Sequence, residues 1–220
     1  MAYTLLGSSI SPYVRKVKLV LLEKNLEHAT EDVIPFNPPK GWRAISPLGK
    51  IPAFRHDDKI INDSTIICEY LERLHPSPAL QPSDPYLQAR ARWIEEYVDG
   101  GVIPVTGPKV FFELVVKPLL GQTSDEAAAR KIIDEELPAY FDYFESELES
   151  ELAGSFFVGD ELGIADIAVG NLFINLRLCG VRLDAARWKK LSAFVERMHA
   201  RPSFAAVIEP LKGVVGKRWA

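Results

Sequence analysis

The first third of the chain shows two periodicities in turn. Short runs of apolar and β-branched residues alternate with stretches in which apolar residues recur at helical spacing, the pattern of an α/β domain. A region rich in proline and glycine separates the first helix and its flanking strands from a hairpin pattern. The predicted elements are a strand at 3–6, a helix at 12–25, a strand at 28–33, a loop region at 34–50, hairpin strands at 51–55 and 59–61, and a helix from 64 to about 75.

The remainder of the chain largely lacks strand signals. Residues 78–85 are rich in proline and have no periodicity, which predicts a linker, and the segments after them have helical periodicity. Residues 164–178 are apolar almost all round, which predicts a buried helix. Other helices are expected at 86–120 with a bend near 100–108, at 124–151, at 187–200 and at 202–208. We therefore expect an α/β domain at 1–77 and an all-helical domain at 86–220.

Composition narrows the class of protein. The chain has 220 residues, of which 47% are apolar, enough for a substantial core, and its net charge of −4 favours neither nucleic acid nor an anionic membrane as a partner. No apolar run approaches the roughly 20 residues of a membrane span, and the first residues lack the order of a signal peptide. Cys68 and Cys179 both lie in apolar helical patterns, which fits a reduced cytoplasmic compartment. The histidines lack metal-ligand spacing, so we expect no metal site.

Three short motifs of the first domain carry candidate chemistry. They are S-x-S-P-Y-x-R-K-V at 9–17, G-K-I-P at 49–52, and the pair Asp63-Ser64 at a helix start. With the linker and the helical domain behind them, these motifs resemble the cytosolic glutathione transferases, and the resemblance covers essentially the whole chain. It implies a thioredoxin-like N-terminal domain, a C-terminal α-helical bundle domain, and glutathione as co-substrate.

The resemblance implies that Ser11 holds the glutathione sulfur as a thiolate. Lowering a thiol pKa from about 8.5 by about two units takes roughly 2.7 kcal/mol. A hydroxyl hydrogen bond to a charged acceptor supplies about 1.5–3 kcal/mol, and a helix N-terminus adds about 0.3–1 kcal/mol. Ser11 would then be a hydrogen-bond donor, and the sulfur of the ligand the nucleophile. The alternatives are that Ser11 is a plain N-cap, or that Ser9 is the donor.

The chain lacks the residues that two other mechanisms of this fold require. Positions 11 and 14 hold Ser and Val, so no mixed disulfide can form with the protein at this helix start. The first strand ends Leu5-Leu6-Gly7, without the tyrosine of tyrosine-type transferases. Tyr13 lies close by, but a packing role suits it at least as well. The chain therefore resembles the serine-type members.

The remaining motifs are interpreted as contacts to the glutathione backbone. The resemblance implies a cis peptide bond before Pro52, which would free the N–H and C=O of Ile51 to pair with the cysteinyl backbone of the ligand. Ser64, at a helix N-terminus, would bind the γ-glutamyl carboxylate, and Asp63 would pair with the α-amino group. Both residues can equally be plain helix caps, and Asp63 is shorter than the Glu or Gln that the family usually carries.

Charged residues outside the motifs are candidates for the ends of the ligand. Lys50 is the first choice for the glycyl carboxylate because it adjoins the Ile51-Pro52 turn, and Lys40 is the second, although surface lysines are usually just solvated. Asp99 resembles an acid that reaches the amine of the ligand across a dimer. An exposed helix acid without such a role is an equal alternative.

The second domain contributes a candidate pocket and a candidate cap. Ile10, Phe111 and Phe112 are expected to line an apolar second-substrate site, although a core stripe of aromatic residues explains the two phenylalanines as well. Gly163 and Asp166 resemble the family's capping box at the start of its buried helix. Asp166 is therefore predicted to be a folding residue and not a catalytic one.

Together these features predict a cytoplasmic, homodimeric detoxification enzyme that conjugates the glutathione thiolate to small hydrophobic electrophiles. No metal, nucleic acid or membrane is expected as a partner. A glutathione-dependent isomerase or peroxidase of the same fold stays open, although the isomerases carry a Ser-Ser-Cys turn where this chain has Ser11-Pro12-Tyr13. The rival from another class is a non-catalytic transferase-like interaction protein. It is expected to have lost some of the three motifs, all of which this chain retains.

Overall fold

The computed structural model describes residues 2–215. The chain divides into two compact units, one up to Leu80 and one from Gln81 onward. We call them the sheet unit and the helical unit. Residues 216–220 of the helical domain expected at 86–220 lie outside the described residues.

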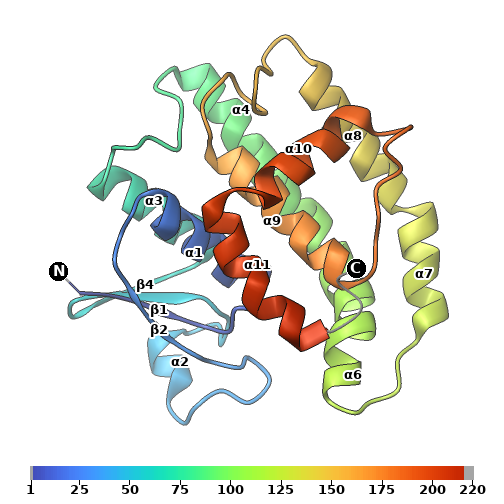
Figure 1. Ribbon diagram of the computed structural model, residues 1–220. Helices are drawn as coiled ribbons and strands as arrows, with labels where there is room; N and C mark the ends of the chain where they lie inside the picture. The colour runs from blue at the N-terminus through green and yellow to red at the C-terminus, as the bar shows by residue number, and fades with distance from the viewer. Residues whose placement is uncertain (1, 216–220) are drawn as a thin grey trace. The chain divides into compact units, whose positions relative to one another are not determined.

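The sheet unit is built on four strands, β1 (Tyr3–Leu6), β2 (Ala29–Glu31), β3 (Ala53–His56) and β4 (Lys59–Asn62). Their order is β2-β1-β3-β4, with β2 parallel to β1 and the other neighbours antiparallel (Figure 1). Leu5 lies opposite Phe54 in the register of β1 and β3, and both side chains are fully buried. β1 follows the prediction and β4 is one residue longer than predicted, whereas β2 is shorter than the expected 28–33 and β3 begins at Ala53, two residues later than the expected 51.

Three helices complete this unit: α1 (Pro12–Glu23), α2 (Trp42–Ile45) and α3 (Ser64–Leu74). The helices α1 and α3 pack together on one face of the sheet, and α2 lies on the other face (Figure 1). The expected loop region at 34–50 is therefore interrupted by α2. Gly41 begins this helix with a φ of 84°, and the side chain of Trp42 is 3% exposed. A single helical turn held by one buried tryptophan is too short to produce a periodic pattern.

The helical unit begins with one long helical segment that changes its winding. It consists of α4 (Pro85–Glu96), the π-helical η1 (Tyr97–Val102), α5 (Ile103–Thr106), the π-helical η2 (Gly107–Val116) and α6 (Lys117–Leu119). The irregularity falls on the stretch predicted to bend. Pro104 and Pro108 cannot donate to the carbonyl four residues earlier, and their rings clash with it. Wider π turns around them are one way in which a helix accommodates such breaks.

The amphipathic stretch at 124–151 forms two helices, α7 (Glu126–Glu135) and α8 (Leu137–Glu149), and not the single helix that we predicted. The break falls at Glu136, two residues before Pro138. A proline at this position cannot continue the preceding helix but suits the first turn of the next one. Apolar periodicity runs through both helices, so the pattern alone does not reveal the break.

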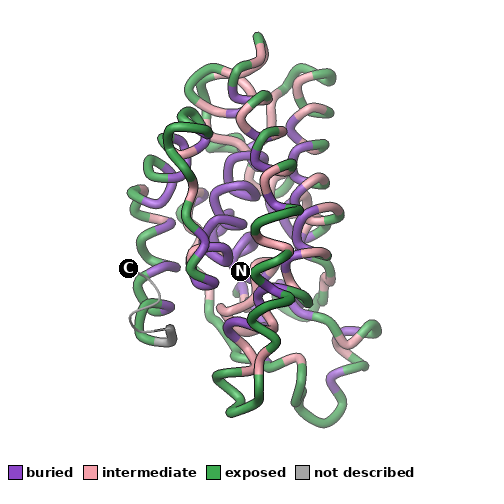
Figure 2. The backbone as a smooth tube through the Cα atoms, turned by 90° about the vertical axis from the view of Figure 1, so that its right-hand side faces the viewer, coloured by how far each residue is buried: buried purple, intermediate pink, exposed green. Residues whose placement is uncertain are grey.

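The core of the helical unit is α9 (Ile164–Leu178), in which every residue except Arg177 is buried. Around it pack α4, η1 and η2 together with α10 (Lys189–His199) and α11 (Pro202–Val215). Figure 2 shows this arrangement as a purple helix enclosed by helices that are green on their outer sides. The predicted bounds of α9 are confirmed, whereas α11 extends beyond the predicted 202–208. Among residues 2–215, no helix combines the length and the apolarity needed to cross a membrane.

Candidate active site

The start of α1 presents the candidate hydroxyl. Ser11 is the N-cap, with φ −75° and ψ 129°, and Pro12 occupies the first helical position, as predicted. Its Oγ accepts a hydrogen bond from the backbone N–H of Val14 at the long distance of 3.5 Å. A hydroxyl that accepts still has its own proton to donate. Half-buried Ser11 can therefore cap the helix and donate to an anion at the same time.

A buried guanidinium group holds the loop that leads into this cap. Nη1 of Arg15 donates to the carbonyl oxygens of Ser9 and Ile10, both at 2.9 Å, and the residue is fully buried. Burial lowers the pKa of the Arg15 guanidinium to about 9, so it remains charged at neutral pH. The sequence motifs did not reveal this role. The available signal was an arginine among the apolar positions of α1, four residues after the cap.

The turn at 49–52 lies against the start of α1. The Ile51-Pro52 peptide bond is cis, as the resemblance predicted. Gly7, at the end of β1, has a φ of 150°, and a Cβ there would lie 2.6 Å from Cγ2 of Val14 and 3.2 Å from Cβ of Ile51. Only glycine fits such a gap. The first two motifs are thus in close contact through a residue that belongs to neither.

The third motif forms the start of α3. Asp63 is its N-cap with φ 75°, and Oδ1 accepts from the backbone N–H groups of Thr65 at 2.9 Å and Ile66 at 3.2 Å. Both hydrogen bonds end on the same carboxylate oxygen. Ser64 is only 4% exposed. Nζ of the buried Lys16 donates to the Thr65 hydroxyl at 2.9 Å, which ties α1 to the beginning of α3.

The two lysine candidates lie on either side of α2. Both Lys40 and Lys50 are exposed, and neither ammonium group pairs with another residue among residues 2–215. The Lys50 carbonyl accepts from Oγ of Ser46 at 2.7 Å, which anchors the backbone before the cis bond and leaves the side chain free. Exposure alone does not distinguish a binding lysine from a solvated one.

The expected second-substrate residues are divided between the units. Ile10 is half-buried in the sheet unit, whereas Phe111 is 8% exposed and Phe112 half-buried in η2 of the helical unit. Asp99, in η1, is half-buried. Their roles stay predictions. The π-helical winding of η1 and η2 is a feature often found at functional sites.

The start of α9 has the carboxylate cap that the sequence predicted. Oδ1 of Asp166 accepts from the Phe157 backbone N–H at 2.9 Å, and Oδ2 accepts from that of Gly163 at 2.8 Å. Gly163 has no side chain, so only the aspartate half of a capping box exists. Burial raises the pKa of the Asp166 carboxyl to about 7. No group of side chains in residues 2–215 could hold a metal ion.

Comparison with known proteins identifies the family. The glutathione S-transferase N-terminal domain family matches residues 5–79, and the C-terminal domain family matches residues 111–210. An uncharacterized GST-like protein of Escherichia coli, YibF, is 31% identical, over 94% of this chain and 98% of its own. A probable maleylacetoacetate isomerase of Caenorhabditis elegans is 30% identical, over 93% and 90%.

A solved structure gives the same result. The glutathione S-transferase of Methylobacterium radiotolerans, in complex with glutathione sulfonate, is 29% identical and superimposes with a TM-score of 0.76, covering 94% of this chain and 95% of that one. The two-domain fold that we predicted, thioredoxin-like and then helical, is thereby confirmed. The chain belongs to the glutathione S-transferase superfamily.

Proposed function

We propose that this protein binds glutathione in the sheet unit, ionises its thiol with the Ser11 hydroxyl, and conjugates the sulfur to a hydrophobic electrophile. Membership of the superfamily supports glutathione as the substrate, as does the relative solved with glutathione sulfonate. The observation that carries the proposal is the cap of α1, where Ser11 accepts from Val14 only at 3.5 Å and keeps a proton to donate.

The reaction needs no general base on the protein. The thiol proton leaves to water when the Ser11 O–H and the N-terminus of α1 stabilise the anion. The thiolate then attacks an electrophilic carbon, a C–S bond forms, and the leaving group departs with the electron pair of its bond. Binding of the peptide is assigned to the backbone of Ile51, to Asp63 and Ser64, and to Lys50 with Lys40 as second choice.

Serine variants test the assignment. We expect Ser11→Ala to lower kcat for a generic aryl halide by about ten- to a thousandfold, the range for losing one anion-stabilising donor, with little change in glutathione affinity. Ser9→Ala is the matched control, two residues earlier in the same loop, and should keep turnover within about threefold. Loss of turnover in the control with none in Ser11→Ala would transfer the role to Ser9. Equal turnover in all three proteins would refute the mechanism.

Isomerisation is the second candidate, because a probable maleylacetoacetate isomerase is 30% identical over nearly the full chain. In an isomerase the thiolate would add to the substrate and leave again, so glutathione is regenerated. Conjugation consumes one thiol for each product, and a peroxidase would convert the thiol to disulfide. Titration of free thiol and of glutathione disulfide during turnover separates the three reactions. A constant thiol concentration during product formation would overturn the conjugation proposal.

The assembly is proposed on the resemblance. We propose a cytoplasmic homodimer in which Asp99 serves the site of the partner subunit. Sedimentation equilibrium tests the dimer, and Asp99→Asn tests the carboxylate through the KM for glutathione. A monomer that is fully active would contradict both.

A further inference from the structure

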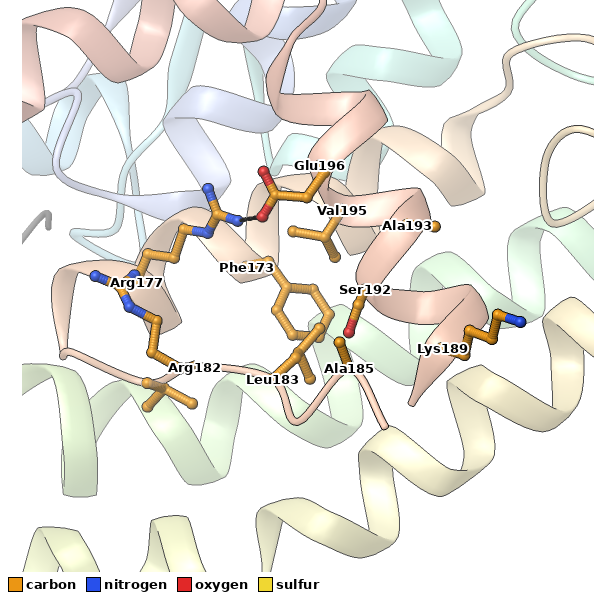
Figure 3. A pocket seen from close by; sticks show the side chains of 11 residues that line it. Phe173, Arg177, Arg182, Leu183, Ala185, Lys189, Ser192, Ala193, Val195 and Glu196 are labelled. Carbon is orange, nitrogen blue, oxygen red and sulfur yellow. Dashed lines mark hydrogen bonds and ion pairs between the residues drawn. The ribbon is translucent and has the colours of Figure 1, made fainter. Parts of the chain in front are cut away.

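Two consecutive cations of α1 are buried, although most charged side chains lie at the surface. In the helical unit, for example, Arg177 of α9 is paired with Glu196 of α10 beside a cavity of about 380 Å³, and both side chains reach solvent (Figure 3). In the sheet unit, Arg15 and Lys16 are only 0% and 1% exposed. Burial of a charge is costly unless nearby groups compensate it. Two such cations in succession therefore point to a specific requirement at this place in the fold.

The two buried cations contact different parts of the candidate site. Arg15 donates to the backbone carbonyls of the loop that leads into Ser11. Lys16 contacts the beginning of α3, where its Nζ donates to Oγ1 of Thr65 at 2.9 Å. Lys16 thereby connects the helix that carries Ser11 to the helix start that is proposed to bind the γ-glutamyl carboxylate.

The position of the Lys16 ammonium group favours an anion at the start of α3. Thr65 is the second residue of α3, and helical side chains lean toward the N-terminus of their helix, so its hydroxyl lies at that end. A cation there is disfavoured by the positive end of the helix dipole as well as by its burial. A carboxylate bound at Ser64, the first residue of α3, would offset both effects.

The same hydrogen bond supports a strained residue. Asp63 has φ 75° and ψ 130°, a conformation that side chains other than glycine rarely adopt. Such strain persists only where the surrounding contacts hold it. On one side, Nδ2 of Asn62 donates to the Ile45 carbonyl at 3.0 Å, and on the other side Thr65 accepts from Lys16. Lys16 thus helps to fix the backbone direction of Ser64, which lies between these two contacts.

The charges around this turn match those of an amino-acid head group. Asp63 is exposed, whereas Lys16 is buried, so the acid lies at the solvent side of the first turn and the cation at its buried side. The γ-glutamyl group carries an amine and a carboxylate on one carbon atom. An acid for the amine and a cation for the carboxylate would orient that carbon in a single way.

We propose that Lys16 is a positioning residue that makes the start of α3 selective for the γ-glutamyl carboxylate, through its hydrogen bond to Thr65 and through its charge. This gives a function to the lysine of the first motif. The inference rests on the proposed binding of glutathione, but it concerns the carboxylate end of the ligand and not the sulfur.

Two glutathione analogues test the proposal by calorimetric titration of the full chain. In 4-aminobutyryl-cysteinyl-glycine the γ-glutamyl carboxylate is missing, and in glutaryl-cysteinyl-glycine the amine is missing. We expect Lys16→Met to weaken binding of glutathione and of the glutaryl peptide about five- to twentyfold, because both carry the carboxylate. Binding of the 4-aminobutyryl peptide should change less than about twofold, since it has no carboxylate to lose a counter-charge.

Lys18→Met is the matched control, because it removes one positive charge from the same helix at a half-buried position. It should change the affinity for glutathione less than about twofold. Thr65→Val is the second variant. It keeps the volume of the side chain, leaves Lys16 in place and removes only the acceptor, and we expect about three- to tenfold weaker glutathione binding. It tests the same contact if Lys16→Met does not fold.

Steady-state kinetics distinguish positioning from a general loss of structure. Lys16→Met should raise the KM for glutathione about five- to twentyfold, with kcat at saturating glutathione within about twofold of the wild type, because the Ser11 cap is unchanged. Equal losses of affinity for all three peptides, equal effects of Lys16→Met and Lys18→Met, or no effect of Thr65→Val would each overturn the inference. A wild-type protein that does not bind glutathione would instead refute the proposed function itself.

Discussion

The starts of α1 and α9 are both capped, but to different degrees. At α9 the Asp166 carboxylate uses both oxygens on backbone N–H groups at 2.8 and 2.9 Å and is 1% exposed. At α1 the Ser11 hydroxyl accepts one N–H at 3.5 Å and remains half-buried. The first cap is complete and has nothing left to offer a ligand. The second is incomplete, and an incomplete cap at an accessible helix start is what an anion can use.

Removing the cap of α9 is expected to have the largest effect on stability. We expect Asp166→Ala to lower the free energy of unfolding by about 2–4 kcal/mol, because the buried N–H of Phe157 and the part-buried N–H of Gly163 lose their acceptor. Urea denaturation measures the change. Glutathione affinity of the folded fraction should be unaffected. A variant with wild-type stability would show that the cap of α9 is not a folding element.

The cap of α9 should also make the free energy of unfolding depend on pH. Because burial raises the pKa of Asp166 to about 7, the folded state retains a proton that the unfolded chain releases near pH 4. This contribution is fully present below about pH 4 and is lost as the pH rises from 4 through 7, at up to about 1.4 kcal/mol per pH unit. Denaturation midpoints of the wild type and Asp166→Asn between pH 4 and 8 isolate it. If the midpoints of both proteins changed with pH in the same way, Asp166 would not be the source of the pH dependence.

The next prediction concerns the loop that leads into Ser11. We expect Arg15→Met to reduce kcat about tenfold, because the Ser9 and Ile10 carbonyls lose their donor and Ser11 is no longer held in place. Arg15→Lys should recover part of the activity. The pH profile of bound-thiolate absorbance distinguishes positioning from stability, since a merely structural role would not shift it in the folded protein.

The smallest effect is expected at the incomplete cap itself. Ser11→Ala should reduce the free energy of unfolding by less than about 1 kcal/mol, since the hydrogen bond that it removes is long. Thermal denaturation of Ser11→Ala and Asp166→Ala, measured alongside turnover, compares the two caps. A stability loss as large as that of Asp166→Ala would mean that the two caps contribute equally to the free energy of unfolding.

Much of the fold was predictable because its signals are local. The start of α1, the hairpin of β3 and β4, and the full extent of α9 followed from capping residues and periodicity. Two elements were predicted wrongly because a single residue determines where each begins. Trp42 holds the single turn of α2, and Pro138 divides α7 from α8 within an unbroken apolar pattern.

The candidate site likewise has features that follow from the local sequence and features that depend on tertiary contacts. The residues that begin helices follow from the local sequence, since a Ser-Pro or Asp-Ser pair satisfies backbone donors within its own turn. The packing of the fold, in contrast, brings Gly7 between Val14 and Ile51 and places Arg15 on the carbonyls before Ser11. Those contacts depend on burial and close approach between segments, and neither is encoded in the spacing of residues along the chain.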